Sequence, residues 1–224
     1  MTHAATRTEE RARRSLGASS DAVYRMVRRA VRARHPGGGT LVDVGCGSGG
    51  LWPHLRDAFD RYVGVDAVRY DGFPAEGEFH ALDLDRGEAP LPDGVADVAA
   101  GVETIEHLEN PRAFIRLLAR LARPGGWVVV TTPNQHSLLS KGTFLLRGQH
   151  AHFQDASYPA HITALLEVDL VRMAAECGLV DVAVEHSGAG RIPGTGRHWP
   201  GVLPRLLPRG FSDNLLLAGR RPHG

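Results

Sequence analysis

A glycine-rich turn between an apolar strand and a helix constrains the fold of this chain more than any other segment. Leu41–Val44 is a short apolar run that predicts a buried strand, and Gly45–Gly50 follows it directly. A helix is expected near Leu51–Phe59, and a second strand over Arg61–Val65 ends at Asp66. This succession is typical of a parallel sheet in which a bare glycine turn lets a ligand approach the backbone.

The same alternation continues along the chain. Further strands are predicted near Phe79–Leu82, over Ala96–Val102 and over Trp127–Thr132. Between the last two, Asn110-Pro111 predicts the start of a helix, because Asn caps helix N-termini and Pro suits the first helical position. Apolar strands alternating with helices predict an α/β fold, a Rossmann-like doubly wound sheet covered on both faces.

The end of the chain changes character. Glu167–Cys177 predicts a helix closed by Gly178, and Val180–Val184 and Asn214–Gly219 predict two more strands. No convincing helix separates these strands, so we expect an antiparallel pair at the sheet edge. The prediction is therefore a seven-stranded sheet, mostly parallel with an antiparallel last strand.

The chain is expected to form one domain over residues 19–224, preceded by a flexible tail over 1–18. Insertions are expected near 134–160 and 188–210, where long segments join the predicted elements. An amphipathic helix is predicted over Ser20–Arg34. Its arginines form either a solvated face, which we favour, or a nucleic-acid face.

The composition limits which partners and which cellular compartment we expect for the protein. The formal net charge of +1 argues against binding of a polyanion by bulk electrostatics. Two cysteines give no disulfide framework, and no apolar run approaches 18 residues. We therefore expect a cytoplasmic protein with no signal peptide and no membrane span.

Asp66 adds a functional hint to the glycine turn. It ends the second predicted strand about 20 residues beyond the turn, where a carboxylate can accept hydrogen bonds from ribose hydroxyls. The spacing of Gly45, Gly47 and Gly50 also fits a dinucleotide fingerprint. From these residues alone, a nicotinamide cofactor and another nucleoside cofactor both stay open.

The segment Leu41–Gly49 resembles the first motif of class I S-adenosylmethionine-dependent methyltransferases, with Asp43 before a Gly-x-Gly-x-Gly turn. The resemblance continues through Asp83-Leu84, Leu91–Asp97 and Pro124–Gly126, and covers roughly residues 40–219. Trp52 and Pro53 in the first helix depart from the usual pattern.

The resemblance implies S-adenosyl-L-methionine as cofactor and a set of residues that bind it. The glycines would lie along its methionine part, Asp66 would hold the ribose, and Asp83 with Leu84 would meet the adenine. The full expected cofactor-binding set is Asp43, Gly45, Cys46, Gly47, Gly49, Asp66, Asp83, Leu84 and Glu103.

The segment Glu103-Thr104-Ile105-Glu106-His107 follows the fourth predicted strand. If this turn is helical, Glu103 lies beside Glu106 and His107. The segment is similar to one shared by ubiquinone-pathway O-methyltransferases and small-RNA terminal-ribose methyltransferases, in which Glu-x-x-Glu-His holds a divalent metal. His161 is the best-placed further ligand, with His136, His150 and His152 as competitors.

This resemblance implies a metal site of Glu103, Glu106, His107 and His161 and a catalytic set of His107, Glu106 and His161. Carboxylates favour Mg²⁺ or Mn²⁺, and histidine allows Zn²⁺ or Fe²⁺. Two other interpretations stay open. His107 or a loop histidine acts as a general base without metal, or the turn only packs against the cofactor.

The sequence therefore predicts a methyltransferase that acts on an oxygen of a hydroxylated small molecule, such as a secondary metabolite, a sugar or an aromatic diol. Action on the terminal ribose of RNA and, from another class, an NAD-dependent oxidoreductase are the alternatives. We expect no nucleic-acid partner. We also expect no membrane contact, because 134–160 carries only Lys141 and Arg147 as basic residues. The oligomeric state stays open, with a homodimer as one option.

Overall fold

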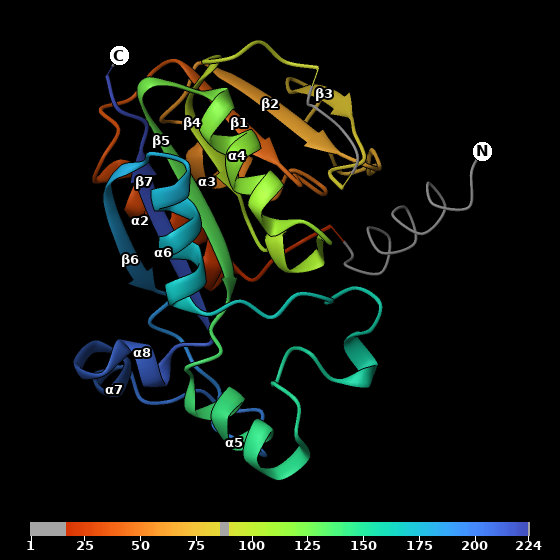
Figure 1. Ribbon diagram of the computed structural model, residues 1–224, viewed down its shortest axis with the longest axis vertical. Helices are drawn as coiled ribbons and strands as arrows, with labels where there is room; N and C mark the ends of the chain where they lie inside the picture. The colour runs from red at the N-terminus through yellow and green to blue at the C-terminus, as the bar shows by residue number, and fades with distance from the viewer. Residues whose placement is uncertain (1–16, 86–89, 224) are drawn as a thin grey trace.

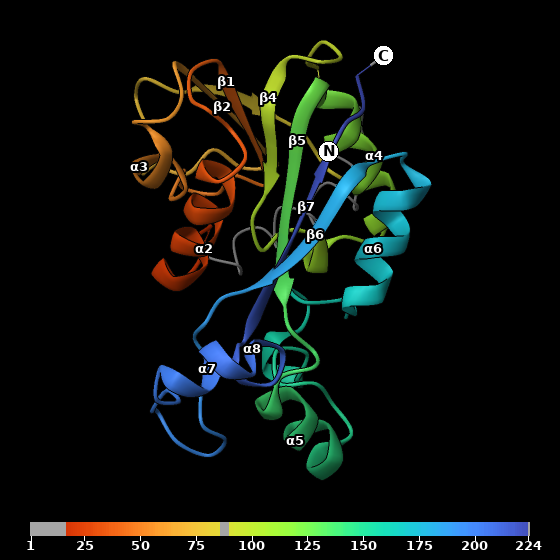
Figure 2. The same ribbon diagram turned by 90° about the vertical axis from the view of Figure 1, so that its left-hand side faces the viewer.

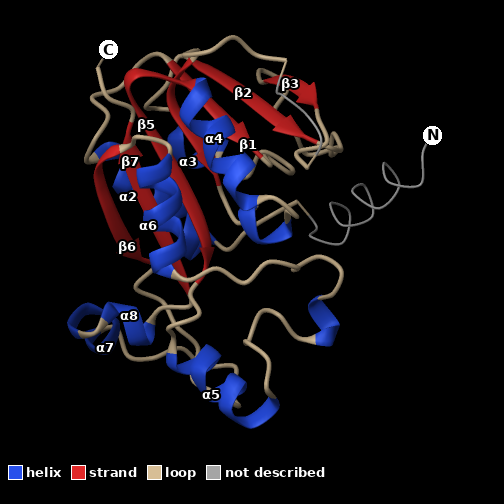
Figure 3. Ribbon diagram, in the orientation of Figure 1, coloured by secondary structure: helices blue, strands red, loops and turns tan. Residues whose placement is uncertain are grey.

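A seven-stranded sheet forms the centre of the protein, as the computed structural model shows (Figure 1 and Figure 3). The structure describes residues 17–85 and 90–223, so most of the tail expected over 1–18 lies outside the described residues. The strand order is β3-β2-β1-β4-β5-β7-β6. The strands are β1 (Thr40–Val44), β2 (Arg61–Asp66), β3 (Glu78–Ala81), β4 (Ala96–Gly101), β5 (Ala122–Pro133), β6 (Val180–His186) and β7 (Asn214–Arg220).

The sheet is parallel from β3 to β5, and β7 is antiparallel to both of its neighbours. Leu217 of β7 pairs with Val130 of β5 on one side and with Val184 of β6 on the other. The predicted antiparallel pair at the edge is confirmed. β6 is the edge strand, and the last strand lies inside the sheet.

Helices cover both faces, as Figure 2 shows edge-on. α2 (Asp21–Arg32) and α3 (Trp52–Leu55) lie on one face, and α4 (Pro111–Leu121) and α6 (Glu167–Glu176) lie on the other. Alternate residues of the buried strands feed two apolar cores: Val129 packs with α2, and its neighbour Val130 packs with α4 and α6. The Rossmann-like doubly wound fold is confirmed.

Local chemistry accounts for the helices. Val23, Val27 and Ala30 of α2 are buried, as the helical spacing predicts. At the start of α4, Asn110 Oδ1 accepts a hydrogen bond from the Ala113 N–H at 3.0 Å, and Pro111 occupies the first position.

α3 is shorter than the helix expected over residues 51–59. After Leu55 the Ala58 N–H bonds to the Leu55 carbonyl three residues back, and the Ala58 carbonyl accepts from the Gly38 N–H. These turn contacts end the helix, and Leu55 and Phe59 on either side of them are buried.

Both inserted segments lie beyond the carboxyl ends of the parallel strands (Figure 1). The first contains α5 (Leu138–Arg147) and the short 3-10 helix η2 (Asp155–Ser157), and the second contains α7 (Val202–Leu206) and α8 (Pro208–Phe211). Asn134 Nδ2 joins them through hydrogen bonds to the carbonyls of Arg209 and Ser212, both at 2.8 Å. Within the described ranges, each helix is too short or too polar to cross a membrane.

Candidate active site

The glycine turn after β1 has no room for side chains, because two other segments pack closely against its backbone. Gly45 and Gly47 have φ of 79° and 52°, which side chains rarely allow. A Cβ on Gly45 would lie 2.3 Å from the Thr104 side chain, and one on Gly47 would lie 2.2 Å from the Gly17 carbonyl oxygen. The turn is thus held between the segment before α2 and the segment after β4.

Asp66 at the end of β2 is fastened to this turn. Its Oδ2 accepts a hydrogen bond from the Gly47 N–H at 2.8 Å, and its Oδ1 accepts one from the Val68 N–H at 3.3 Å. Burial raises the pKa of the carboxyl, and these backbone donors act against that rise. The Asp66 carboxylate therefore lies in the cleft with a fixed orientation.

Asp43 in β1 is a buried carboxyl with one unused oxygen. The Tyr62 hydroxyl donates to Oδ2 at 3.0 Å, whereas Oδ1 is buried without a hydrogen-bond partner. Burial, together with the nearby Asp66, raises the pKa of Asp43 to about 7. A buried, unpartnered carboxylate oxygen is costly, so this site favours a ligand that brings a donor or a positive charge.

A cavity of about 520 Å³ runs from the glycine turn to the inserted segments, a size suited to a small ligand. Most of the predicted site residues line it, namely Asp43, Gly45, Cys46, Gly47, Asp66, Leu84, Glu103, Glu106, His107 and His161. Gly49 and Asp83 do not. Gly49 faces Pro74, and Asp83 Oδ1 accepts from the N–H of Asp85, which does line the cavity.

The turn after β4 is not one continuous helix. The 3-10 helix η1 spans Ile105–His107, and Glu103 before it has the left-handed φ of 49°. Glu103 Oε1 accepts from the Thr131 hydroxyl at 2.9 Å, and Oε2 accepts from Asn214 Nδ2 at 2.7 Å. Its carboxylate is thus bonded to β5 and β7, and the structure does not bring it into one donor cluster with Glu106 and His107.

Glu106, His107 and His161 do form such a cluster, because one donor atom from each lies within 4.8 Å of the others. The strap of residues 160–163, which connects η2 to the segment before α6, carries His161 into place. The backbone N–H groups of Ile162 and Thr163 both donate to the Glu106 carbonyl at 3.0 Å. The strap is therefore bonded directly to η1.

Hydrogen bonds fix the donor atoms of this cluster. His107 Nδ1 lies 2.7 Å from the Ala160 carbonyl oxygen, so Nδ1 carries the proton and Nε2 carries the lone pair. Metal-binding histidines commonly make this kind of bond. Glu106 Oε2 accepts from the Thr132 hydroxyl at 3.2 Å, while Glu106 Oε1 and His161 Nδ1 are buried without partners.

Burial shifts the pKa of each of these groups in the direction that favours its neutral form. It raises the pKa of Glu106 to about 8 and that of Glu103 well above its ordinary value, with Glu106 adding to the second rise. It also lowers the pKa of His161 to about 4, assisted by His107. A divalent cation would reverse the penalty on the carboxylates and use the neutral imidazoles. The donor set therefore fits such an ion.

Two of the competing histidines lie away from the cluster. His136 is hydrogen-bonded to Arg209, and His150 Nδ1 lies 2.9 Å from the Ser140 hydroxyl. His152 lines the cavity on the side of the inserted segments.

Sequence reasoning missed Asp213, which forms a polar wall of the cavity together with Arg191. Arg191 Nε donates to Asp213 Oδ2 at 2.8 Å, and its terminal nitrogen lies 2.6 Å from His152 Nε2. Asp213 Oδ1 and His152 Nδ1 are buried without partners. The one signal available in the sequence was the position of Asp213 just before a strand that borders the cleft.

Comparison with known proteins gives a family. A family model described as "Methyltransferase domain" matches residues 14–184. The chain is 28% identical over 161 residues to a probable S-adenosylmethionine-dependent methyltransferase of Mycolicibacterium smegmatis, covering 68% of the chain and 62% of that protein. It is 31% identical over 108 residues to a ubiquinone biosynthesis O-methyltransferase of Bordetella pertussis, covering 44% of each. The chain thus spans less than two thirds of the length of both relatives.

Among solved structures, the fold is similar to that of a SAM-dependent methyltransferase from Archaeoglobus fulgidus. The TM-score is 0.64 at 17% identity, over 88% of this chain and 94% of that one. A likeness at this identity concerns the fold alone.

Proposed function

This chain belongs to the S-adenosylmethionine-dependent methyltransferase family, and on that premise we propose that it methylates an oxygen of a hydroxylated small molecule with the help of a divalent metal. One observation carries the proposal: the cluster of Glu106, His107 and His161 opens into the same cavity as the glycine turn. A cofactor end and a metal end in one cavity suit transfer of a methyl group to an oriented oxygen.

The cofactor end is formed by acidic and glycine residues. When bound, S-adenosylmethionine supplies an electrophilic methyl group on a positively charged sulfur. In our proposal Asp66 accepts hydrogen bonds from the ribose, and Gly45 and Gly47 leave room along the methionine part. The unused oxygen of Asp43 adds negative charge that complements a cationic ligand.

At the metal end, Glu106, His107 and His161 are the proposed ligands. A divalent ion held there would bind neighbouring hydroxyls of the acceptor and lower the pKa of the attacking oxygen. The Ala160 carbonyl keeps the His107 lone pair on Nε2, and Thr132 orients Glu106. Glu103, whose oxygens are engaged by Thr131 and Asn214, lies beside the site and offers no ligand atom in this conformation.

The polar wall supports a hydroxylated acceptor. Arg191 donates to His152 Nε2, so the proton of His152 lies on Nδ1, which is a buried donor without a partner. Asp213 Oδ1 is a buried acceptor without a partner. An acceptor that both donates and accepts hydrogen bonds would satisfy the two atoms.

The test is methyl transfer from labelled S-adenosylmethionine to a panel of diols, sugars and amines, using protein stripped with a chelator and then resupplied with Mg²⁺, Mn²⁺, Zn²⁺ or Fe²⁺. We expect transfer to a hydroxyl only when a divalent ion is present. Glu106→Gln and His161→Ala should lower the rate by about 100-fold or more while leaving affinity for S-adenosylhomocysteine nearly unchanged. His150→Gln, a nearby histidine outside the cavity, is the matched control.

Equal rates with and without metal, together with unchanged rates in both site variants, would overturn the metal role. Transfer to amines alone would overturn the O-methyl assignment.

Action on the terminal ribose of RNA is the alternative within methyl transfer. Three of the four arginines of α2 are engaged by carboxylates, which gives this alternative little support: Arg25 pairs with Asp21, and both Arg28 and Arg32 pair with Asp57. An RNA with a free 3′ end in the same panel tests it directly. Membership of the methyltransferase family gives no support to the other alternative, an NAD-dependent oxidoreductase.

A further inference from the structure

The two inserted segments expose an unusual amount of apolar surface. Of the eleven large apolar side chains that are exposed among residues 17–85 and 90–223, eight lie within 134–160 and 188–210. Leu145 and Leu146 on α5 are 83% and 87% exposed, and Leu206 on α7 is 72% exposed. The others are Leu138, Phe144, Tyr158, Val202 and Leu207. Apolar surface gathered in this way marks an interaction site.

Helix geometry places the α5 leucines at the tip of the inserted segment. Gly148 takes the left-handed conformation that ends α5, so Leu145, Leu146 and Arg147 form its last turn. The exposed residues of α7 and of the following turn likewise lie near Arg205. Exposed leucines that no other part of the protein covers, next to arginines, are typical of a helix that lies on a membrane surface.

The charge of these segments is strongly one-sided. They contain six basic residues and one acidic residue, whereas the whole chain carries a formal charge of only +1. The rest of the protein is therefore net acidic. These residues are Lys141, Arg147, Arg191, Arg197, Arg205, Arg209 and, as the single acid, Asp155.

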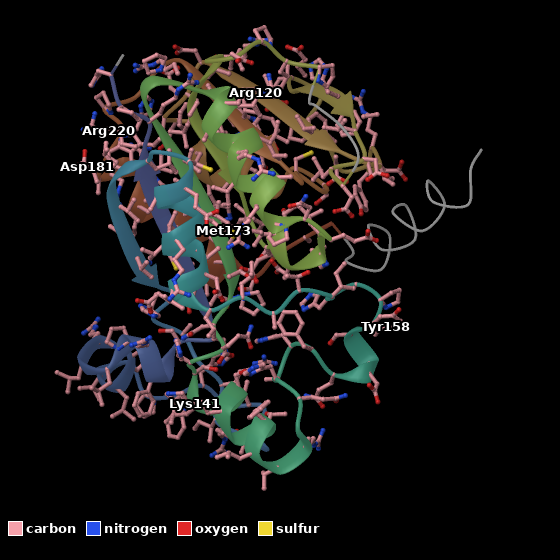
Figure 4. All side chains as sticks on the ribbon, viewed as in Figure 1. Arg120, Lys141, Tyr158, Met173, Asp181 and Arg220 are labelled. Atoms are coloured by element: carbon pink, nitrogen blue, oxygen red, sulfur yellow. The ribbon has the colours of Figure 1, made fainter. Side chains whose placement is uncertain are left out.

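The fold brings the two segments to one end of the molecule. α5, α7 and α8 all lie below the sheet in Figures 1 and 2. In Figure 4, Lys141 and Tyr158 lie at this end, opposite Arg220. The hydrogen bonds from Asn134 to the Arg209 and Ser212 carbonyls hold the segments together. Arg191 pairs with Asp213 and Arg209 pairs with Glu167, so the charge that the second segment adds to Lys141 and Arg147 comes from Arg197 and Arg205.

We propose that this end of the protein, formed by α5, η2, α7 and α8, docks on an anionic lipid surface. The exposed leucines enter the interface, and the basic residues that pair with lipid headgroups are Lys141, Arg147, Arg197 and Arg205. The sequence predicts no membrane contact, because residues 134–160 contain only two basic residues. In the structure the basic residues of 188–210 lie at the same end of the molecule, so the count for one segment alone no longer applies.

Charge and side-chain type favour lipid over the other partners. A symmetric dimer through this surface would place two net-positive patches against each other. Single-stranded nucleic acid is bound through aromatic rings that stack on bases, whereas the exposed side chains here are mainly leucines. Because His152 and Arg191 of these segments also line the cavity, a docked protein would open its acceptor end toward the lipid.

The experiment is co-sedimentation of the full chain with vesicles of phosphatidylcholine alone or of phosphatidylcholine mixed with phosphatidylglycerol. We expect at least about tenfold stronger binding to the mixed vesicles, weakening as salt is added. L145S/L146S should weaken that binding by about tenfold or more, and K141Q/R205Q should remove the preference for the anionic lipid.

V180S is the control, since Val180 is exposed at the start of β6 and pairs with Arg220, at the end of the molecule opposite the proposed surface. It should bind vesicles as the wild type does. S-adenosylhomocysteine binding by every variant reports that the fold is intact. No binding to either vesicle, or binding that L145S/L146S leaves unchanged, would overturn the proposal. A wild-type dimer that L145S/L146S converts to a monomer, without vesicle binding, would assign the surface to a second copy and also overturn it.

Discussion

At the scale of single residues, Asp43 couples the cofactor end of the cavity to pH. Its pKa is about 7 in the folded protein against an ordinary value of 3.8. Between these values the native state holds a proton that the unfolded chain has released, so the free energy of unfolding of the ligand-free protein falls as pH rises. Asp43→Asn removes this contribution. Urea unfolding at pH 4 and pH 8 should show that the wild type loses about 2–4 kcal/mol more than the variant does.

A parallel pH dependence in wild type and variant would contradict this role of Asp43. Glu103 and Glu106 also have raised pKa values, and they contribute equally to the pH dependence of unfolding in both proteins. The contribution of Asp43 is therefore the difference between the wild type and the variant.

Asp66 is the second residue whose role can be isolated. Asp66→Asn keeps one oxygen to accept from the Gly47 N–H, but it loses the second acceptor, which the Val68 N–H uses, and the negative charge offered to a ribose. We expect the dissociation constant for S-adenosylhomocysteine, measured by calorimetry, to rise by about 10–100-fold. Asp60→Asn is a matched control, since Asp60 accepts a glycine N–H at 2.7 Å from Gly39, away from the cavity. Wild-type affinity in Asp66→Asn would exclude the ribose role.

At the scale of elements, the strap of residues 160–163 holds His161 beside His107, so the proposed metal site depends on it. Thr163 Oγ1 donates to the Leu108 carbonyl at 2.7 Å, beside the two backbone bonds to Glu106. Thr163→Val should loosen the strap by about 1 kcal/mol and weaken divalent-metal affinity several-fold through His161, with little change in S-adenosylhomocysteine binding.

Thr143→Val is the control for that experiment, because Thr143 Oγ1 makes a bond of the same length to the Leu139 carbonyl within α5. If the two variants bind metal equally well, the strap does not position His161.

At the scale of the whole molecule, ligand binding should stabilise the fold as a unit. S-adenosylhomocysteine at about 100 times its dissociation constant should add about 2.7 kcal/mol to the free energy of unfolding, which raises the melting temperature by roughly 5–10 °C. NAD at the same concentration should give no shift. A shift with NAD and none with S-adenosylhomocysteine would contradict the cofactor assignment.

The layered architecture could be predicted from the sequence because most of the buried strands contain an apolar run, and glycine or proline marks several of the breaks, as at Gly45–Gly50 and Gly178. The cofactor end was also largely predictable, since Asp43, the glycines and Asp66 act through short-range geometry around β1 and β2. His161 could be preferred over three other histidines only by the resemblance, and its place beside His107 depends on backbone bonds more than 50 residues apart in the chain.

Other features lay beyond sequence reasoning for clear physical reasons. The left-handed backbone of Glu103 breaks the helical spacing on which its grouping with Glu106 relied. The Arg191–Asp213 wall and the proposed docking surface both require two segments that come together only through tertiary contacts.

The position of β7 has a consequence for how the protein is made. β7 is the last of the seven strands to leave the ribosome, yet it lies between β5 and β6. Until it arrives, the nascent sheet has a gap one strand wide, and β6 has no neighbour to pair with. Asp213 and Asn214, which bond to Arg191 and Glu103, arrive with this strand. Closure of the sheet and completion of the acceptor wall are therefore one event, so a chain interrupted during synthesis has neither.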